Sequence, residues 1–437
     1  MADLARLAAE PIFAEPNPTH YAWAGGTLQR LLRSPQPIAE TWAFFSGPDR
    51  AARIAGAGGL TMADLVQRCP EVLGPAGQDP KNNGQKYFFV KFLDPSDFPR
   101  FAYVGFRPET AGALGPEALR RQVAALLAQD REALEQLAAC VRPRIATQAA
   151  FAKFQAAYKA WAIAHAAAEW EATRAPELAG FAERPADAAR ALESQRQVRR
   201  QLAQLIHRIE FEPGRAILIE TPTLHAIAGL SLQIHPNTPE HFHPKDELWL
   251  YEPLPSPGHA DGWILVEPQR TFDRTESGGD FFTPFAWEGV GSTGRLGFRK
   301  QITPEYLRKF VALMDATPHP REHFLRRTAQ MAVPQSRLEG QVGWLRVVEE
   351  PAWPHFIVRL LRFDGPGEAS VPQRRDSFVE VHPTQGVVEL VLSGGGQRER
   401  MERLTPARPV FLPASLPYET VRFRASAPAR AYWFSRG

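Results

Sequence analysis

The chain has 437 residues, of which 44% are hydrophobic and 23% are charged, and its formal net charge is +3. This length predicts two or three domains with a well-buried core. A small net charge with scattered arginines argues against a nucleic-acid partner or a role at a membrane surface.

Short apolar runs punctuated by proline and glycine cover residues 1–110 and 211–437. This pattern is typical of many short strands joined by tight turns. The strands predicted in this way are YFFVKFL (87–93), RAILIE (215–220), LWLY (248–251), WILV (263–266), HFIVRLLRF (355–363) and VVELVL (387–392).

Residues 116–209 have a different composition, rich in Ala, Leu, Gln, Glu and Arg. Apolar residues such as Leu119, Val123 and Leu126 recur there at helical spacing. Proline residues divide the segment into three or four predicted helices, and we expect a further helix over 304–315. A single histidine, His165, lies on an Ala-rich helix, where a structural role is expected.

This order of elements predicts a mainly β fold with a helical insertion, namely two jelly-roll β-domains plus an α-helical block. One discontinuous domain, which would carry the catalytic site, comprises 1–115 and 210–315, and the helical insertion spans 116–209. A C-terminal β-domain follows over 337–437.

The compartment is indicated by the cysteines and the N-terminal residues. Two distant cysteines, Cys69 and Cys140, favour a reducing compartment over a disulfide framework. MADLARLAAEPIF lacks the basic start and long apolar core of a signal peptide, and no run of about 18 apolar residues occurs. We expect a cytoplasmic protein with no membrane contact, either a monomer or a weak homo-oligomer.

The chemistry gathers between Leu224 and Trp249, where four of the twelve histidines occur within nineteen residues. If SLQIH forms a strand, Gln233 and His235 project from the same face. A Gln-x-His pair with Glu247 from a second strand and His225 from an upstream segment offers nitrogen and oxygen ligands that suit zinc or a similar divalent ion.

The same stretch contains a competing ligand set. His241, His243 and Glu247 have the H-x-H-x3-E spacing of the general cupin metal motif. Both sets share Glu247, so the residues alone leave the choice between them open.

These motifs resemble those of the type I mannose-6-phosphate isomerases, a family of the cupin superfamily. LSLQIHP (230–236) is similar to the LSIQVHP signature, whose Gln and His bind zinc. KDELWL (245–250) resembles the K-x-E-L segment that supplies a Glu ligand, and ETPTLHAIAG (220–229) resembles the segment that supplies a His. The resemblance thus implies one zinc ion per chain. Its ligands would be His225, Gln233, His235 and Glu247.

Shorter motifs extend the resemblance over most of the chain. HYAWAGGTLQRLL (20–32), PIAETWAFFSGP (37–48) and FFVKFL (88–93) look like the family's opening segments. EVHPTQGVVELVLSGGG (380–396) and PVFLPASLPYETVRF (409–423) resemble its second cupin. The only histidines of that domain, His355 and His382, form no H-x-H or Q-x-H pair, so we expect it to hold no metal. Both β-domains would then be cupins.

The resemblance implies an aldose–ketose isomerase that interconverts mannose 6-phosphate and fructose 6-phosphate through a cis-enediol(ate). Arg299, in RKQITPEY, matches the family's catalytic Arg and would stabilise the enediolate. Lys245 would contact the phosphate or the hydroxyls of the sugar. Glu267 and Asp273 occupy the positions of the family's acidic pair, and both are candidates for the base.

Two other functions stay open at this point. One is a cupin metalloenzyme of another class, such as an iron dioxygenase that uses His241, His243 and Glu247. The other is a non-catalytic sugar-binding cupin protein. Zinc without oxygen consumption would favour the isomerase, and iron with oxygen uptake would favour the oxygenase.

The sequence departs from the family pattern in two places. In the family, the Gln-x-His strand precedes the helical insertion, whereas here Tyr103 and Gly105 stand at that position and the Gln-x-His motif follows the helices. In addition, about two dozen residues separate Asp273 from Arg299, where the family has almost none.

Overall fold

The structure is a computed structural model, which describes the chain in separate ranges of residues. For several strands the description covers the backbone alone. The described residues are 2–19, 29–30, 32–36, 38, 40–41, 43–44, 46, 51–75, 85–90, 101–171, 177–210, 215–220, 223–227, 233–234, 250–255, 264–269, 274–275, 284–290, 293–298, 303–327, 329–331, 342–346 and 357–435.

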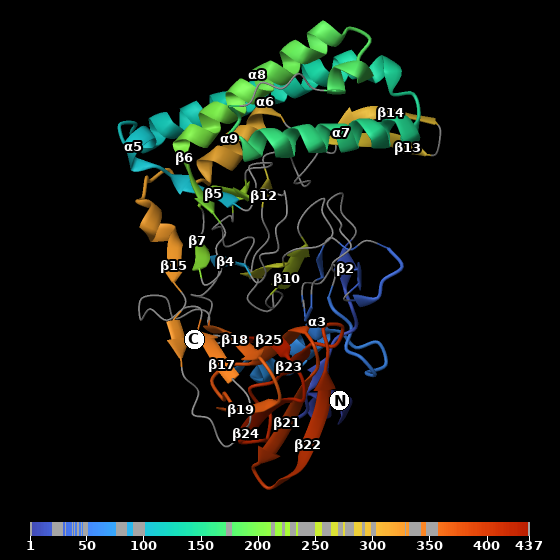
Figure 1. Cartoon of the computed structure of the whole chain (residues 1–437), viewed down its shortest axis with the longest axis vertical. Coiled ribbons are helices and arrows are strands. Elements are labelled where there is room, and N and C mark those ends of the chain that lie inside the picture. Colours follow the sequence, from blue (N-terminus) through green and yellow to red (C-terminus); the bar gives the residue numbers. More distant parts are fainter. Residues whose placement is uncertain are drawn as a thin grey trace.

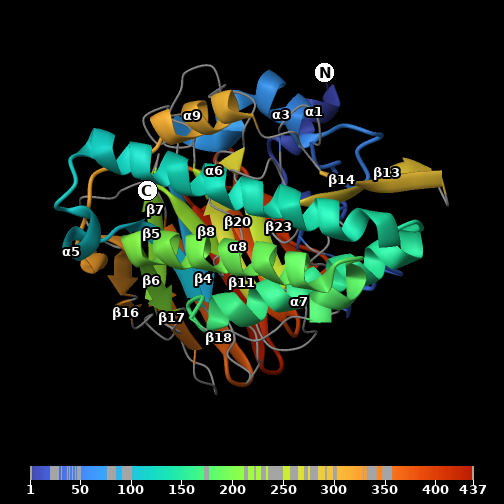
Figure 2. The same cartoon turned by 90° about the horizontal axis from the view of Figure 1, so that it is seen from above.

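The elements form three tiers along the longest axis of the molecule (Figure 1). Long helices make a layer at one end, the sheets of the central part of the chain lie in the middle, and the C-terminal sheets occupy the other end. Seen from above, the long helices lie across the molecule and cover the middle sheets (Figure 2).

The helical layer consists of α6 (Pro116–Val141), α7 (Gln148–Ala167) and α8 (Pro185–Leu205), which agrees with the helices predicted for this segment. Proline begins α6 and α8, where its missing N–H leaves no hydrogen bond unmade. The Thr147 side chain caps α7 by accepting a hydrogen bond from the N–H of Ala150 at 3.1 Å. Apolar stripes on α6 and α8 face each other and form part of the largest core cluster among the described residues.

The remaining helices are shorter. Thr61 and Asp64 form a capping box at the start of the helix that follows, with each side chain accepting from the backbone of the other residue. The shorter α-helices are α1 (Ala2–Leu7), α3 (Met62–Arg68), α5 (Pro108–Ala111) and α9 (Pro304–Ala312). The 3-10 turns are η1 (Pro70–Leu73), η3 (Arg142–Arg144), η4 (Glu177–Phe181) and η6 (Arg321–Phe324). Among the described helices, none is both long and apolar enough to span a bilayer.

Two five-stranded antiparallel sheets make up the middle tier. The first has the order β10 (Leu250–Pro255), β11 (Ile264–Gln269), β4 (Gln85–Val90), β7 (Arg215–Glu220) and β15 (Leu325–Arg327). The second has the order β12 (Arg274–Thr275), β9 (Gln233–Ile234), β8 (His225–Ile227), β5 (Phe101–Phe106) and β6 (Ile206–Glu210).

A hairpin joins the middle tier to the helical layer. Its strands, β13 (Phe285–Val290) and β14 (Thr293–Phe298), lie in the segment that separates Asp273 from Arg299. The Phe285 ring packs against Phe154 of α7 with ring centroids 5.2 Å apart. The Arg131 guanidinium of α6 lies 3.8 Å from the centroid of the Phe298 ring. These contacts give the extra segment a packing role against the helices.

The C-terminal tier contains a seven-stranded and a four-stranded antiparallel sheet that enclose a core of Val, Leu and Phe side chains. The seven-stranded sheet has the order β1 (Ile12–Phe13), β23 (Val410–Leu412), β20 (Val379–Gln385), β25 (Ala429–Ser435), β18 (Ile357–Phe363), β17 (Val342–Arg346) and β16 (Ala329–Met331). The four-stranded sheet has the order β19 (Gly367–Pro372), β24 (Thr420–Ala425), β21 (Val388–Gly394) and β22 (Gln397–Leu404).

The N-terminal part of the chain packs against this C-terminal tier. Ile12 pairs with Phe411, and α1 and α3 share a core with Phe378, Phe411 and Phe434. A small pair, β2 (Pro18–Thr19) with β3 (Glu40–Thr41), completes the described strands. The division of the chain into domains at 115, 210 and 337 stays a prediction.

Antiparallel sheets with a separate helical layer agree with the predicted fold class at this level. Every pairing between the described strands is antiparallel, which fits strands joined by short turns. The finer arrangement into two jelly-roll domains stays a prediction.

Candidate functional site

The candidate site is centred on His225, the first residue of β8, which is completely buried. Its Nδ1 lies 3.0 Å from the carbonyl oxygen of Thr223. Since a carbonyl oxygen only accepts hydrogen bonds, Nδ1 carries the proton and Nε2 keeps its lone pair. This is the tautomer in which a histidine ligates a metal, with its other nitrogen donating to a backbone carbonyl.

The register of the sheet brings the Gln-x-His motif to this histidine. Gln233 of β9 is the direct partner of His225, and Thr275 of β12 is the partner of Gln233 on the other side. Val104 of β5 pairs with His225, and His207 of β6 pairs with Val104, so one row of residues crosses the whole sheet. Directly opposite residues of an antiparallel pair lie on the same face, about 5 Å apart.

One further candidate lies in the other middle sheet. Glu267 is in β11, where its backbone pairs with Glu252 of β10. The remaining sequence-predicted site residues lie outside the described residues: His235, Lys245, Glu247, Asp273 and Arg299, together with the alternative ligands His241 and His243. Within the part of the chain that the structure describes, no three His, Cys, Asp or Glu side chains gather around a common point.

Tyr103 and Gly105, the residues that the motif resemblance predicted at ligand positions, have other roles here. The Tyr103 side chain is 3% exposed, packs edge-on against Phe101 and belongs to the core beneath the helices. Gly105 sits at a bulge of β5 with φ of +57°, and a Cβ there would approach the Phe324 ring to 2.1 Å. The position therefore requires glycine for both conformation and space.

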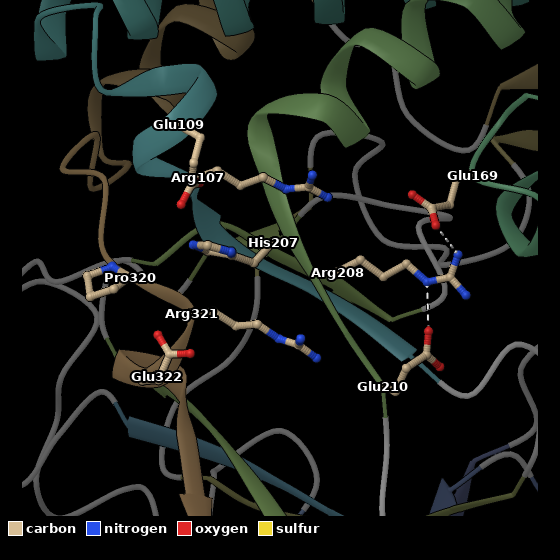
Figure 3. A pocket seen from close by; sticks show the side chains of 9 residues that line it. All are labelled: Arg107, Glu109, Glu169, His207, Arg208, Glu210, Pro320, Arg321 and Glu322. Carbon is tan, nitrogen blue, oxygen red and sulfur yellow. Dashed lines mark hydrogen bonds and ion pairs between the residues drawn. The ribbon is translucent and has the colours of Figure 1, made fainter.

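A pocket of about 620 Å³ lies along β6, the edge strand of the same sheet (Figure 3). Its cationic side chains are Arg107, Arg208 and Arg321, and His207 lies between their elements. Four glutamates complete most of the lining: Glu109, Glu169, Glu210 and Glu322. In the close-up, Glu109 and Glu322 lie on one side with His207, and Glu169 and Glu210 lie on the other with Arg208 (Figure 3).

Sequence reasoning missed this pocket because its residues come from four separate segments and match no motif. The one local signal is the alternation of charged and apolar residues in RIE (208–210), shortly after α8. Such alternation predicts a half-exposed strand but gives no information about a partner across it.

Comparisons with known proteins give structural similarity at low sequence identity. No family model matches the chain, and no curated protein matches its sequence. Mannose 6-phosphate isomerase from Salmonella typhimurium in the apo form has a TM-score of 0.46 and 13% identity, with 98% of this chain and 99% of that chain covered. The same protein bound to fructose 6-phosphate and zinc gives a TM-score of 0.46 and 13% identity, covering 98% of this chain and 100% of that one.

A structure titled as mannose 6-phosphate isomerase bound with zinc and yttrium gives a TM-score of 0.46 and 14% identity, with 98% and 100% of the two chains covered. Similarity at this level does not transfer an activity. The function is therefore argued from the residues and register of this chain.

Proposed function

We propose that the protein is a metal-dependent aldose–ketose isomerase that interconverts mannose 6-phosphate and fructose 6-phosphate. The observation that carries this proposal is the pairing of Gln233 with His225 across β9 and β8. The two residues come from the two motifs that, by resemblance, each supply zinc ligands. The motifs alone do not determine this pairing, since antiparallel strands can pair in many registers.

The residues present fit a divalent metal ion. His225 has the tautomer of a metal ligand, and the register puts Gln233 at the opposite position. His235 and Glu247 would complete a set of two imidazole nitrogens and two oxygens, which suits zinc. When bound, such an ion polarises the carbonyl and hydroxyl oxygens of an open-chain sugar.

The chain's own residues would carry out the proton transfer between C1 and C2. Glu267 or Asp273 would remove the carbon-bound proton and return it to the neighbouring carbon. Arg299 would hold its positive charge beside the oxygen that becomes negative in the cis-enediolate. Lys245 would bind the phosphate or the sugar hydroxyls and so fix the substrate relative to the base.

The test combines metal content with activity. The purified protein is analysed for bound metal and assayed from mannose 6-phosphate to fructose 6-phosphate, with formation of fructose 6-phosphate coupled to NADP⁺ reduction. We expect about one zinc per chain, loss of activity on chelation and recovery on addition of zinc. His225→Ala and Gln233→Ala should each lower metal affinity by at least about tenfold and activity with it.

His319→Gln is a suitable control, because this half-exposed side chain pairs with Asp315 and lies outside the predicted ligand set. It should retain metal and activity. Activity that survives in His225→Ala and is lost in His241→Ala would replace the proposed ligand set with the alternative one. A zinc-loaded protein with no isomerase activity would exclude the isomerase itself.

A further inference from the structure

The pocket along β6 is separate from the candidate metal site. His207 and His225 lie on β6 and β8, with Val104 of β5 between them in the register. Two strand spacings correspond to about 10 Å. None of the residues that line the pocket belongs to the predicted ligand or catalytic set. The pocket therefore needs its own explanation.

Two of its three arginines have guanidinium groups without a carboxylate partner in the described part of the chain. Arg107 donates from Nε to the carbonyl oxygen of Ile206 at 2.6 Å, which fixes the side chain and leaves its terminal nitrogens available. The side chain of Arg321, an exposed residue of η6, has no hydrogen bond or ion pair to any described residue. These groups supply forked donors of the kind that bind phosphate or carboxylate oxygens.

Arg208 differs from these two because it is fully engaged. Its Nη1 lies 2.9 Å from Glu169 and its Nε lies 2.9 Å from Glu210 (Figure 3). Its guanidinium carbon lies 4.1 Å from the centroid of the Phe101 ring. Glu169 is held at φ of +51°, a conformation that residues other than glycine rarely adopt. The side of the pocket that carries Arg208 is thus held by ion pairs within the protein. On the other side, Arg107 and Arg321 have guanidinium nitrogens that can bind a ligand.

His207 adds a hydrogen-bond acceptor between the two open arginines. The residue is 6% exposed, and its Nε2 lies 2.7 Å from the carbonyl oxygen of His319, so Nε2 carries the proton and Nδ1 is the acceptor. Burial lowers the pKa of His207, and the positive charges of Arg107 and Arg321 lower it further. The hydrogen bond to His319 and the negative charge of Glu109 raise the pKa, but the net shift is downward. The ring is therefore neutral at pH 7.

A buried hydroxyl lies behind the pocket. The Tyr103 hydroxyl is completely enclosed and has no hydrogen-bond partner among the described residues. Burial and the nearby charge of Glu169 raise the pKa of Tyr103 to about 12, against the charges of Arg208 and Arg107. A buried polar atom without a partner is uncommon in folded proteins, but this hydroxyl is enclosed by the core and is not part of the lining of the pocket.

We propose that this pocket binds a small molecule that combines a phosphate group with several hydroxyls. The phosphate would lie between Arg107 and Arg321, which supply donors and positive charge. The hydroxyls would donate to Nδ1 of His207 and to the carboxylates of Glu109 and Glu322, because these groups are acceptors. A second phosphate would be repelled by the same carboxylates, which favours a monophosphate of a polyol over a polyphosphate.

The test uses glycerol 3-phosphate, inorganic phosphate and glycerol as probes in calorimetric titrations of the full chain. Wild-type protein should bind glycerol 3-phosphate more tightly than inorganic phosphate, and glycerol least of all. Arg321→Gln should weaken glycerol 3-phosphate at least about tenfold, since one charge-assisted fork is lost. Arg321 is exposed on a turn, so folding of this variant is expected and is checked by circular dichroism.

Two further variants separate the contributions. Glu322→Gln should reduce the preference for glycerol 3-phosphate over inorganic phosphate, because it removes a hydroxyl acceptor and a negative charge together. Arg295→Gln is the matched control, since Arg295 is an exposed arginine paired with Glu288 on the hairpin. Its affinities should equal those of wild type.

The proposal does not depend on the isomerase activity. The same titrations in His225→Ala protein should give the wild-type affinity for glycerol 3-phosphate, whatever happens to metal or turnover. An unchanged affinity in Arg321→Gln would overturn the proposal, and so would equal affinities for all three probes in wild-type protein.

Discussion

Two buried pairs of ionisable side chains, one in the helical layer and one in the C-terminal sheet, are built in different ways. Asp130 of α6 and Arg199 of α8 share two hydrogen bonds, of 2.9 and 2.5 Å, which engage both carboxylate oxygens. Glu380 and His382 are two residues apart on β20 and share one contact of 3.0 Å between Oε2 and Nε2. The other oxygen of Glu380, Oε1, is buried without a partner among the described residues.

The surroundings of the second pair are aromatic. The His382 ring meets the rings of Phe44 and Phe434 edge-on, with centroids 5.7 and 5.6 Å away. Burial raises the pKa of Glu380 and lowers the pKa of His382, so the two groups together hold one proton and carry no net charge. Arg199, in contrast, keeps its guanidinium charge in any protein environment, which makes the first pair an ion pair.

The difference shows that burial alone does not decide whether a pair is charged. A partner that cannot lose its proton and two aligned hydrogen bonds maintain a charged pair between α6 and α8. A partner that loses its proton readily gives a neutral pair in β20. The two pairs should therefore respond differently to mutation and to pH.

The largest expected effect is that of Arg199→Met. This change leaves the Asp130 carboxylate buried without its partner, and we expect the free energy of unfolding to fall by about 3–5 kcal/mol in urea titrations. Arg200→Met is the control on the next residue of α8, where the pair with Glu171 is exposed and the expected loss is below about 1 kcal/mol. Equal losses in the two variants would contradict the interpretation of the Asp130–Arg199 pair.

The second prediction concerns pH and the Glu380–His382 pair. Unfolded, the two groups bind two protons below pH 4.5, one between 4.5 and 6.5 and none above 6.5, whereas the folded pair holds one between the lowered pKa of His382 and the raised pKa of Glu380. Its contribution to stability is thus constant from about pH 4.5 to 6.5. Below pH 4.5 the unfolded state binds more protons than the folded state, so stability falls as the pH falls. Above pH 6.5 the folded state binds more protons, so stability falls as the pH rises. The slope is about 1.4 kcal/mol per pH unit in each case.

Glu380→Gln isolates this effect in the same urea titrations. Without the carboxyl, the loss above pH 6.5 should disappear, because neutral His382 then binds no proton in either state. The loss at acid pH should persist and should begin at pH 6.5, where the unfolded histidine starts to bind a proton. An alkaline loss of the same slope in Glu380→Gln and wild type would assign it to other groups.

The two regions also differ in how far the sequence could predict them. The helical layer can be predicted from local periodicity. The sequence also indicates that Asp130 is buried, because it stands four residues from both Leu126 and Leu134 on the apolar stripe of α6. Strands such as β7 and β21 follow from local apolar runs in the same way. The partner of Asp130, 69 residues away, has no such local signal.

The candidate site depends on pairing, which local patterns do not encode. The motifs predicted that His225 and Gln233 share a site, but the direct pairing of the two residues depends on the register between β8 and β9. The same limit explains the β6 pocket, where Arg107, His207 and Arg321 come from segments about 100 residues apart. From the sequence, Gly105 stands at a predicted ligand position but has no side chain that could bind a metal. The bulge of β5 and the close approach of the Phe324 ring explain why glycine occurs there.

The smallest expected effect is that of replacing both members of the ion pair at once. In Asp130→Leu with Arg199→Met, no charge stays buried, and apolar side chains of similar volume continue the core between α6 and α8. We expect the free energy of unfolding to lie within about 1 kcal/mol of wild type, although each single change costs about 3–5 kcal/mol. A cycle of the four proteins in urea titrations measures this coupling. A double variant whose loss of unfolding free energy equals the sum of the two single losses would contradict this expectation. The pair would then be a net source of stability, and the cost of an unpaired buried charge would not explain the single variants.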